Sequence, residues 1–113
     1  DPAVNHLVNA AAFFDEALVP DFAVENNTAI LYTTLGTYRR KRDELPRRIR
    51  ELGKVKPPYH VNVLLCLVDI PAAEAGECLE SLNLIAVNTG LSLLLAWSSV
   101  EVSRYIQTLY KYQ

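Results

Sequence analysis

Two short and almost entirely apolar segments constrain this chain more than any other feature of its sequence. They are Val61–Val68 and Leu91–Trp97, each of strand length and each preceded by turn-forming residues. A strand that is apolar at nearly every position, rather than at every second one, has to be covered on both of its faces. The two segments therefore predict a mainly parallel sheet with helices on either side.

The preceding residues supply further strands. Thr28–Leu35 is rich in β-branched residues and predicts a strand of similar length. Shorter strands are predicted near Val4–Val8 and Phe22–Val24. With the helices between them, the strands give the alternating order of an α/β domain.

The first helix is predicted over Arg39–Leu52. Asp43 is positioned to cap its main part, and Pro46 then falls in the first turn, where proline is tolerated. Gly53 follows the last helical residue, a common way for a helix to end.

Two later helices are predicted from their caps and from apolar spacing. Pro71 begins the first of them, and its apolar face consists of Ala75, Cys78, Leu79 and Leu82. The spacing of Ser98 and Glu101 is that of a capping box at the start of the other. Its apolar face consists of Val102, Tyr105, Ile106 and Leu109.

Positive charge is concentrated in one segment. Nine of the eleven Lys and Arg residues lie between Arg39 and Lys56, together with three acidic residues, so this segment carries 9 − 3 = +6. The remaining residues include two basic and ten acidic side chains, or −8. The asymmetry favours a surface for a polyanion, although a solvated helix face would produce the same composition.

The sequence contains no recognisable catalytic or metal-binding motif. His6 and His60 are isolated, and the four glycines are scattered rather than grouped in a phosphate-binding loop. Asp69 ends a buried strand, where open α/β sheets carry ligands, but one carboxylate is more simply a turn or helix-capping residue. Cys66 and Cys78 lie in apolar segments and are interpreted as reduced core residues. We therefore expect no cofactor and no metal ion.

The C-terminal part of the chain carries a leucine-rich strand, an Ala-Trp-Ser motif and a helix with Arg-Tyr and Tyr-Lys pairs. These residues are Leu93–Ser99, Glu101, Arg104, Tyr105, Tyr110 and Lys111. They resemble the excision-repair cross-complementing group one family, the small partner subunit of XPF-type DNA-repair endonucleases. Weaker similarity covers nearly the whole chain, at Val19–Phe22, Arg48, Leu52–Lys54 and Val61–Asp69.

The resemblance implies a fold and the loss of an activity. The family's central domain is similar to the XPF nuclease domain, a three-layer restriction-endonuclease-like α/β fold, without its active site. Active relatives carry an aspartate and then Glu-Arg-Lys on the next strand, whose carboxylates hold a divalent metal ion. Aligned on Asp21, those positions here hold Leu31, Tyr32 and Thr33. Leucine and tyrosine do not replace metal-binding carboxylates, so the resemblance implies an inactive subunit and strongly disfavours an active nuclease.

The resemblance also implies DNA as a ligand. In this family the central domain binds single-stranded DNA near junctions with duplex DNA, and the partner subunit cuts. We expect phosphate contacts from the basic segment, namely from Arg39, Arg40, Lys41, Arg42, Arg47, Arg48 and Lys54. Tyr32 and Tyr38 are candidates to stack on bases, although ordinary packing accounts for them equally well.

The competing hypothesis is a protein-docking module. In vertebrate relatives a groove binds a peptide of the damage-verification protein XPA, and the resemblance assigns its counterpart here to Asp21, Tyr32 and Thr37. Two groove tyrosines of the family are replaced by Thr37 and Glu44, and a His-Pro-x-Tyr element by Lys41–Glu44. These departures favour DNA over an XPA-like scaffold at this face.

The resemblance finally implies a cellular setting. Residues 1–113 would form the central domain of a nuclear subunit that works with an XPF-type nuclease in excision, cross-link and recombination repair. The family's C-terminal helix-hairpin-helix domain is absent from this sequence, and a chain that starts at Asp1 resembles a fragment. No segment reaches the roughly 18 apolar residues that span a membrane, so no membrane contact is expected.

Overall fold

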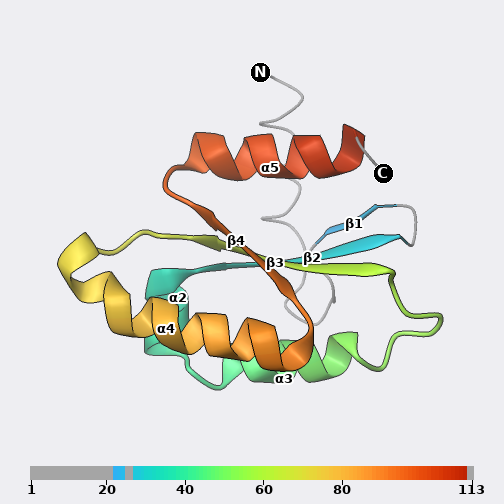
Figure 1. Cartoon of the computed structure of the whole chain (residues 1–113), viewed down its shortest axis with the longest axis horizontal. Helices are drawn as coiled ribbons and strands as arrows, with labels where there is room; N and C mark the ends of the chain where they lie inside the picture. The colour runs from blue at the N-terminus through green and yellow to red at the C-terminus, as the bar shows by residue number, and fades with distance from the viewer. Residues whose placement is uncertain (1–21, 25–26, 112–113) are drawn as a thin grey trace.

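A four-stranded sheet forms the middle layer of the fold (Figure 1). The computed structural model describes residues 22–24 and 27–111. Its strands are β1 (Phe22–Val24), β2 (Thr28–Thr34), β3 (Val61–Leu67) and β4 (Ser92–Ala96). They are neighbours in sequence order, with β2, β3 and β4 parallel and β1 antiparallel to β2. This arrangement confirms the predicted α/β class, whereas the strand predicted near Val4–Val8 lies outside the described residues.

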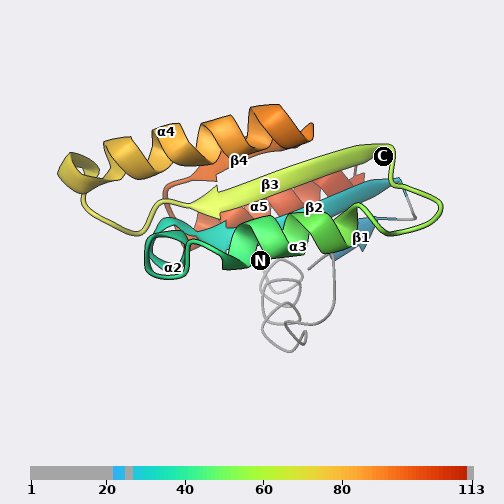
Figure 2. The ribbon, with the colours of Figure 1, turned by 90° about the horizontal axis from the view of Figure 1, so that it is seen from below.

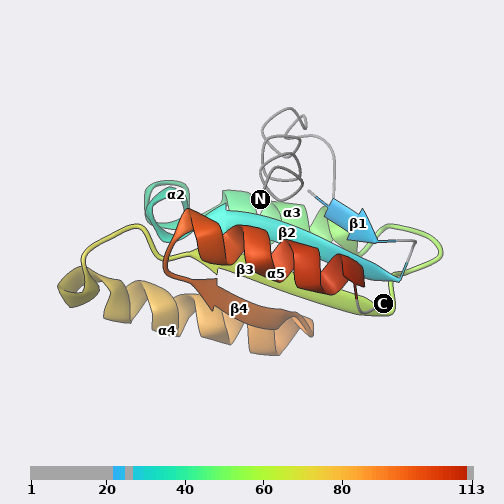
Figure 3. The same cartoon turned by 90° about the horizontal axis from the view of Figure 1, so that it is seen from above.

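Helices cover both faces of the sheet. They are α2 (Leu35–Arg40), α3 (Glu44–Leu52), α4 (Ala72–Thr89) and α5 (Ser99–Lys111). Figures 1 and 2 show α2, α3 and α4 together on one face, and Figure 3 shows α5 lying along the other. None of the helices within the described residues has the length and apolar character needed to cross a membrane.

The sheet separates two apolar clusters, because successive residues of a strand point to opposite faces. On the face of α2–α4, Leu31 and Leu64 pack with helix residues such as Leu35 and Leu82. On the face of α5, Ile30 and Leu65 pack against the helix, which contributes Val102 and Ile106 to the cluster. The central strand β3 is thus buried from both sides, as its apolar sequence predicted.

The helix predicted over Arg39–Leu52 is in fact two helices, α2 and α3, separated by Lys41–Asp43. Pro46 explains the break, since it has no N–H to donate and its ring would clash with the carbonyl group of Arg42 in a continuous helix. Asp43 occupies the predicted N-cap position but makes no side-chain capping hydrogen bond. Gly53 ends α3 with right-handed backbone angles (φ −65°, ψ −15°), so its position is not one that requires glycine.

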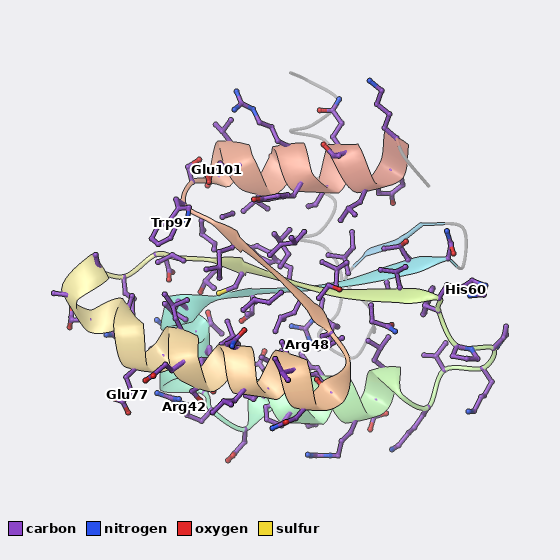
Figure 4. The ribbon with its side chains drawn as sticks, viewed as in Figure 1. Arg42, Arg48, His60, Glu77, Trp97 and Glu101 are labelled. Atoms are coloured by element: carbon purple, nitrogen blue, oxygen red, sulfur yellow. The ribbon has the colours of Figure 1, made fainter. Side chains whose placement is uncertain are left out.

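The predictions for α4 and α5 are confirmed. Pro71 precedes α4, whose predicted apolar face is buried apart from the half-buried Leu79. At the start of α5, the Glu101 N–H donates to Ser98 Oγ at 3.2 Å. The Glu101 carboxylate in turn accepts from the Trp97 N–H at 2.9 Å, which completes a capping-box arrangement shifted by one residue (Figure 4).

Cys66 and Cys78 are free and buried, as predicted. Burial, with a smaller contribution from the Asp69 charge, raises the pKa of the Cys66 thiol from 9.0 to about 12. Since the thiolate is the reactive form, we expect Cys66 to resist iodoacetamide at about pH 8.5 in the native state and to be alkylated in denaturant. Mass spectrometry of a Cys78→Ser variant reports on Cys66 alone, and alkylation at the rate of a free thiol would contradict this account.

The double-sided core makes a second prediction. Leu65 is 0% exposed on β3, whereas Leu84 on α4 is 60% exposed. Leu65→Ala should lower the free energy of unfolding by about 3 kcal/mol, because it removes buried contacts and leaves a cavity. Leu84→Ala is the matched control and should change it by less than about 0.5 kcal/mol. Urea denaturation of both variants tests the difference, and equal costs would contradict the described packing.

Candidate nucleic-acid interface

The positive charge of residues 39–56 forms an exposed surface over α2, α3 and the loop that follows α3. We call this the basic surface, and its exposed residues are Arg39, Arg40, Lys41, Arg42, Arg47, Arg50, Lys54 and Lys56. The set contains six of the seven residues predicted to contact phosphate. Arg50 and Lys56 are additions; Arg50 was detectable from the sequence, because it lies three positions after Arg47 and so shares its face of a helix.

Arg48, the seventh predicted residue, does not belong to the basic surface. Its side chain is 7% exposed and lies between α3 and the sheet (Figure 4). Its Nη1 donates to the Tyr32 carbonyl oxygen at 3.0 Å. This position is inconsistent with the predicted phosphate contact: Arg48 follows Leu45 by three residues and precedes Leu52 by four, so it shares the buried face of α3.

Two residues of the basic surface are attached to neighbouring groups. Arg39 Nη1 lies 3.6 Å from Glu74 Oε1 of α4, in an ion pair exposed on both sides. The Arg42 guanidinium lies over the Tyr38 ring, 4.7 Å from its centroid, and donates to Ser81 Oγ at 3.4 Å. Exposed contacts of this kind contribute little to stability but narrow the positions that the side chains occupy.

Three other arginines of the basic surface, Arg40, Arg47 and Arg50, form no ion pair within the part of the chain that the structure describes. Lys41 and Lys54 lie near Glu44 and Glu51, at 3.9 Å and 3.0 Å. The uncompensated arginines are the groups best able to bind an external anion, since no internal partner has to be displaced.

The charge asymmetry of the sequence is also an asymmetry in space. Residues 57–103 contain no Lys or Arg, and α4 exposes Glu74, Glu77 and Glu80. In Figures 1 and 2, α4 runs along one flank of the α2–α3 layer. A polyanion is therefore attracted to α2 and α3 and repelled by the exposed side of α4.

The candidate stacking residues differ in exposure. Tyr38 is 3% exposed, and its hydroxyl lies 2.5 Å from Ser81 Oγ, so it is a packing residue rather than a platform for bases. Tyr32 is half-buried and packs against the cluster under α5. Its position on the opposite face of the sheet from α3 separates it from the basic surface.

Tyr32 and Thr37 of the predicted peptide groove are described by the structure, whereas Asp21 lies outside the described residues. Thr34 has the same strand orientation as Tyr32, and its Oγ1 lies 2.9 Å from Thr37 Oγ1. A separate depression of about 340 Å³ lies along α5 and is lined by Glu101, Arg104, Tyr105 and Thr108.

The positions assigned to the nuclease motif carry no acidic side chain. Leu31 is 0% exposed, and Thr33 is 7% exposed with its hydroxyl donating to the Thr34 carbonyl oxygen. Among the residues that the structure describes, no three His, Cys, Asp or Glu side chains gather as metal ligands. Asp69 accepts a hydrogen bond from the Gly36 N–H at 2.7 Å, so it serves as a helix-capping partner.

Comparison with known proteins identifies the family of the chain. The family model described as the binding domain of DNA repair protein Ercc1 (rad10/Swi10) matches residues 1–113. The chain belongs to this family. It is 31% identical over 113 residues to the DNA excision repair protein ERCC-1 of Arabidopsis thaliana. The matched region is the whole of this chain and 26% of that protein.

Two further relatives also match most or all of this chain but only part of their own length. The mating-type switching protein swi10 of Schizosaccharomyces pombe is 29% identical over the whole chain, which covers 42% of that protein. The DNA excision repair protein ERCC-1 of Dictyostelium discoideum is 27% identical over 99 residues, or 83% of the chain and 19% of that protein. The chain thus spans less than half the length of the curated relatives it matches.

The position of Arg48 makes a testable prediction. Arg48→Ala should lower the free energy of unfolding by about 2 kcal/mol, because it removes a buried charged donor from the Tyr32 carbonyl group. Arg47→Ala, one residue earlier on the exposed face, should change it by less than about 0.5 kcal/mol. Thermal and urea unfolding measure the change in free energy of unfolding for both variants. An Arg48→Ala variant as stable as the unsubstituted protein would contradict the buried contact.

Proposed function

We propose that this chain is the DNA-binding central domain of a non-catalytic subunit in a DNA-repair endonuclease. The observation that carries the proposal is the basic surface, where eight exposed Lys and Arg side chains lie over α2, α3 and the loop that follows α3. Family membership supports the same function, since two of the relatives are named as DNA excision repair proteins.

The ligand proposed for the basic surface is single-stranded DNA near a junction with duplex DNA. Arg40, Arg47 and Arg50 are the leading phosphate contacts, with Lys41 and Lys54 beside them. Binding of phosphates by these side chains releases counterions, which makes affinity fall steeply with salt. Such contacts position a nucleic acid without reading its sequence, as suits a subunit that helps to place a junction.

The second part of the proposal is that the domain has a nuclease-like fold without catalysis. The parallel sheet between helix layers is consistent with that fold, and Leu31, Tyr32 and Thr33 occupy the positions assigned to Glu-Arg-Lys. Cleavage would come from an XPF-type partner subunit in the nucleus. The central domain would be joined to that partner through a helix-hairpin-helix domain elsewhere in the full protein.

Protein docking is the alternative function, and the depression along α5 is the observation that favours it. Tyr105 lines that depression and packs, with Tyr32, against the cluster beneath α5. A scaffold peptide of the XPA type would bind on this face, away from the basic surface. Amide chemical shifts separate the two functions, because DNA should perturb residues 39–56, whereas a peptide should perturb β2 and α5.

Charge reversal tests the DNA-binding function. Arg40→Glu/Arg47→Glu should weaken single-stranded DNA binding by about tenfold or more at low salt, because two phosphate contacts become repulsive. The slope of log affinity against log salt should become shallower by about 1.4, or ~0.7 for each lost contact on a single strand. Fluorescence anisotropy with a labelled oligonucleotide measures both quantities.

The matched control is Arg104→Glu/Lys111→Glu, which makes the same change in net charge on α5. We expect it to reduce affinity by less than about twofold, since α5 covers the opposite face of the sheet. Equal losses in the two double variants would show that net charge alone governs binding, and would refute the assignment to the basic surface.

A further inference from the structure

Helix α2 carries part of the basic surface, but it is so short that its orientation depends on contacts with the rest of the fold. It has six residues, Leu35–Arg40, and helices of this length are not stable in isolation. Arg39 and Arg40 form its last turn, and Lys41 and Arg42 follow directly. The direction in which these four side chains point therefore depends on what holds the two ends of α2.

The first end of α2 is held by Asp69, which follows β3, the central strand. Its Oδ1 accepts from the Gly36 N–H at 2.7 Å, a short contact with a charged acceptor. Thr34 adds a local cap, because its Oγ1 accepts from the Thr37 N–H at 3.1 Å. Of these two hydrogen bonds, the one to Asp69 joins α2 to the segment that follows the central strand, whereas Thr34 belongs to the same stretch of chain as the helix.

Gly36 permits the close approach of this carboxylate. A Cβ atom at residue 36 would lie 3.1 Å and 3.2 Å from the two Asp69 carboxylate oxygens and 3.4 Å from Arg40 Nη1. The carboxylate thus lies beside the basic surface, yet no ion pair joins Asp69 to Arg40. Its hydrogen-bonded partner is the backbone of the helix.

The second end of α2 is held by α4. The Tyr38 hydroxyl lies 2.5 Å from Ser81 Oγ, and Arg42 donates to the same oxygen at 3.4 Å. Tyr38 is buried beneath these contacts. The helix is therefore fixed at its start by the sheet and near its end by α4.

We propose that Asp69 is a positioning residue for DNA binding, which orients α2 and the arginines that follow through its bond to the Gly36 N–H. The proposal rests on the DNA-binding function of the basic surface. The proposal requires that Asp69, although acidic and next to a DNA-binding surface, strengthens DNA binding. Simple electrostatics requires the opposite sign, because removing a negative charge there favours a polyanion.

The sign of the effect is the test. Asp69→Ala should weaken binding of a labelled single-stranded oligonucleotide by about threefold, since displaced arginines lose phosphate contacts. Asp43→Ala is the matched control, because Asp43 is exposed within the same segment and makes no side-chain capping bond. It should strengthen binding by about twofold through the loss of charge alone.

Gly36→Ala provides a second variant that changes no charge. Its new methyl group must push the Asp69 carboxylate away, so we expect binding to weaken by about twofold and amide shifts to change along α2. In the Asp69→Ala background the same substitution should have no further effect, because the clashing oxygens are gone. Thermal unfolding of each variant confirms that the comparison is made between folded proteins.

Tighter binding by Asp69→Ala, parallel to Asp43→Ala, would overturn the positioning role, as would unchanged affinity in Gly36→Ala. Neither result would affect the DNA-binding function, which depends on the charge-reversal variants of Arg40 and Arg47. If those variants bind normally, the DNA-binding function fails first and the role of Asp69 fails with it.

Discussion

Burial of β3 from both sides is the constraint on which the rest of the structure depends. Leu64 and Leu65 are each 0% exposed and face opposite layers, so neither layer can be removed without exposing the central strand. Parallel neighbours on both sides of β3 require long crossover connections, which α2–α3 and α4 provide. The layer that holds the basic surface exists because this crossover has to cover the sheet.

The basic surface is in turn shaped by the packing of α3. Leu45, Arg48 and Leu52 face the sheet, which leaves Arg47 and Arg50 to point outward. A segment with a charge of +6 repels itself, and the exposed ion pairs with Glu44, Glu51 and Glu74 offset only a small part of that repulsion. Stability therefore comes from the apolar face of α3, whereas the outward arginines add mutual repulsion to the fold.

The elements with regular apolar spacing or clear helix caps could be predicted from the sequence. The three parallel strands, α4 and α5 have strong apolar patterns, and the structure contains them close to their predicted bounds. The break between α2 and α3 was missed because the effect of Pro46 depends on where the helix begins. Proline is tolerated in a first turn but disrupts a helix interior, and tertiary packing decides where the first turn lies. Arg48 was misassigned because its charge was weighted above its spacing. The bond between Asp69 and Gly36 joins residues 33 positions apart, and no local pattern contains that information.

Packing also bears on the proposed loss of catalysis. The position that the family resemblance assigns to a metal-binding glutamate holds Leu31, which is 0% exposed in the cluster beneath α2–α4. A carboxylate at this site would be buried among Leu35, Leu64 and other apolar side chains, and an unpaired charge there would strongly destabilise the fold. A single acidic substitution at Leu31 would therefore not create a metal site, because metal ligands at this position would need an opening through the core. The basic surface, in contrast, lies on the exposed side of the same helix layer, where charged side chains do not disturb the packed core.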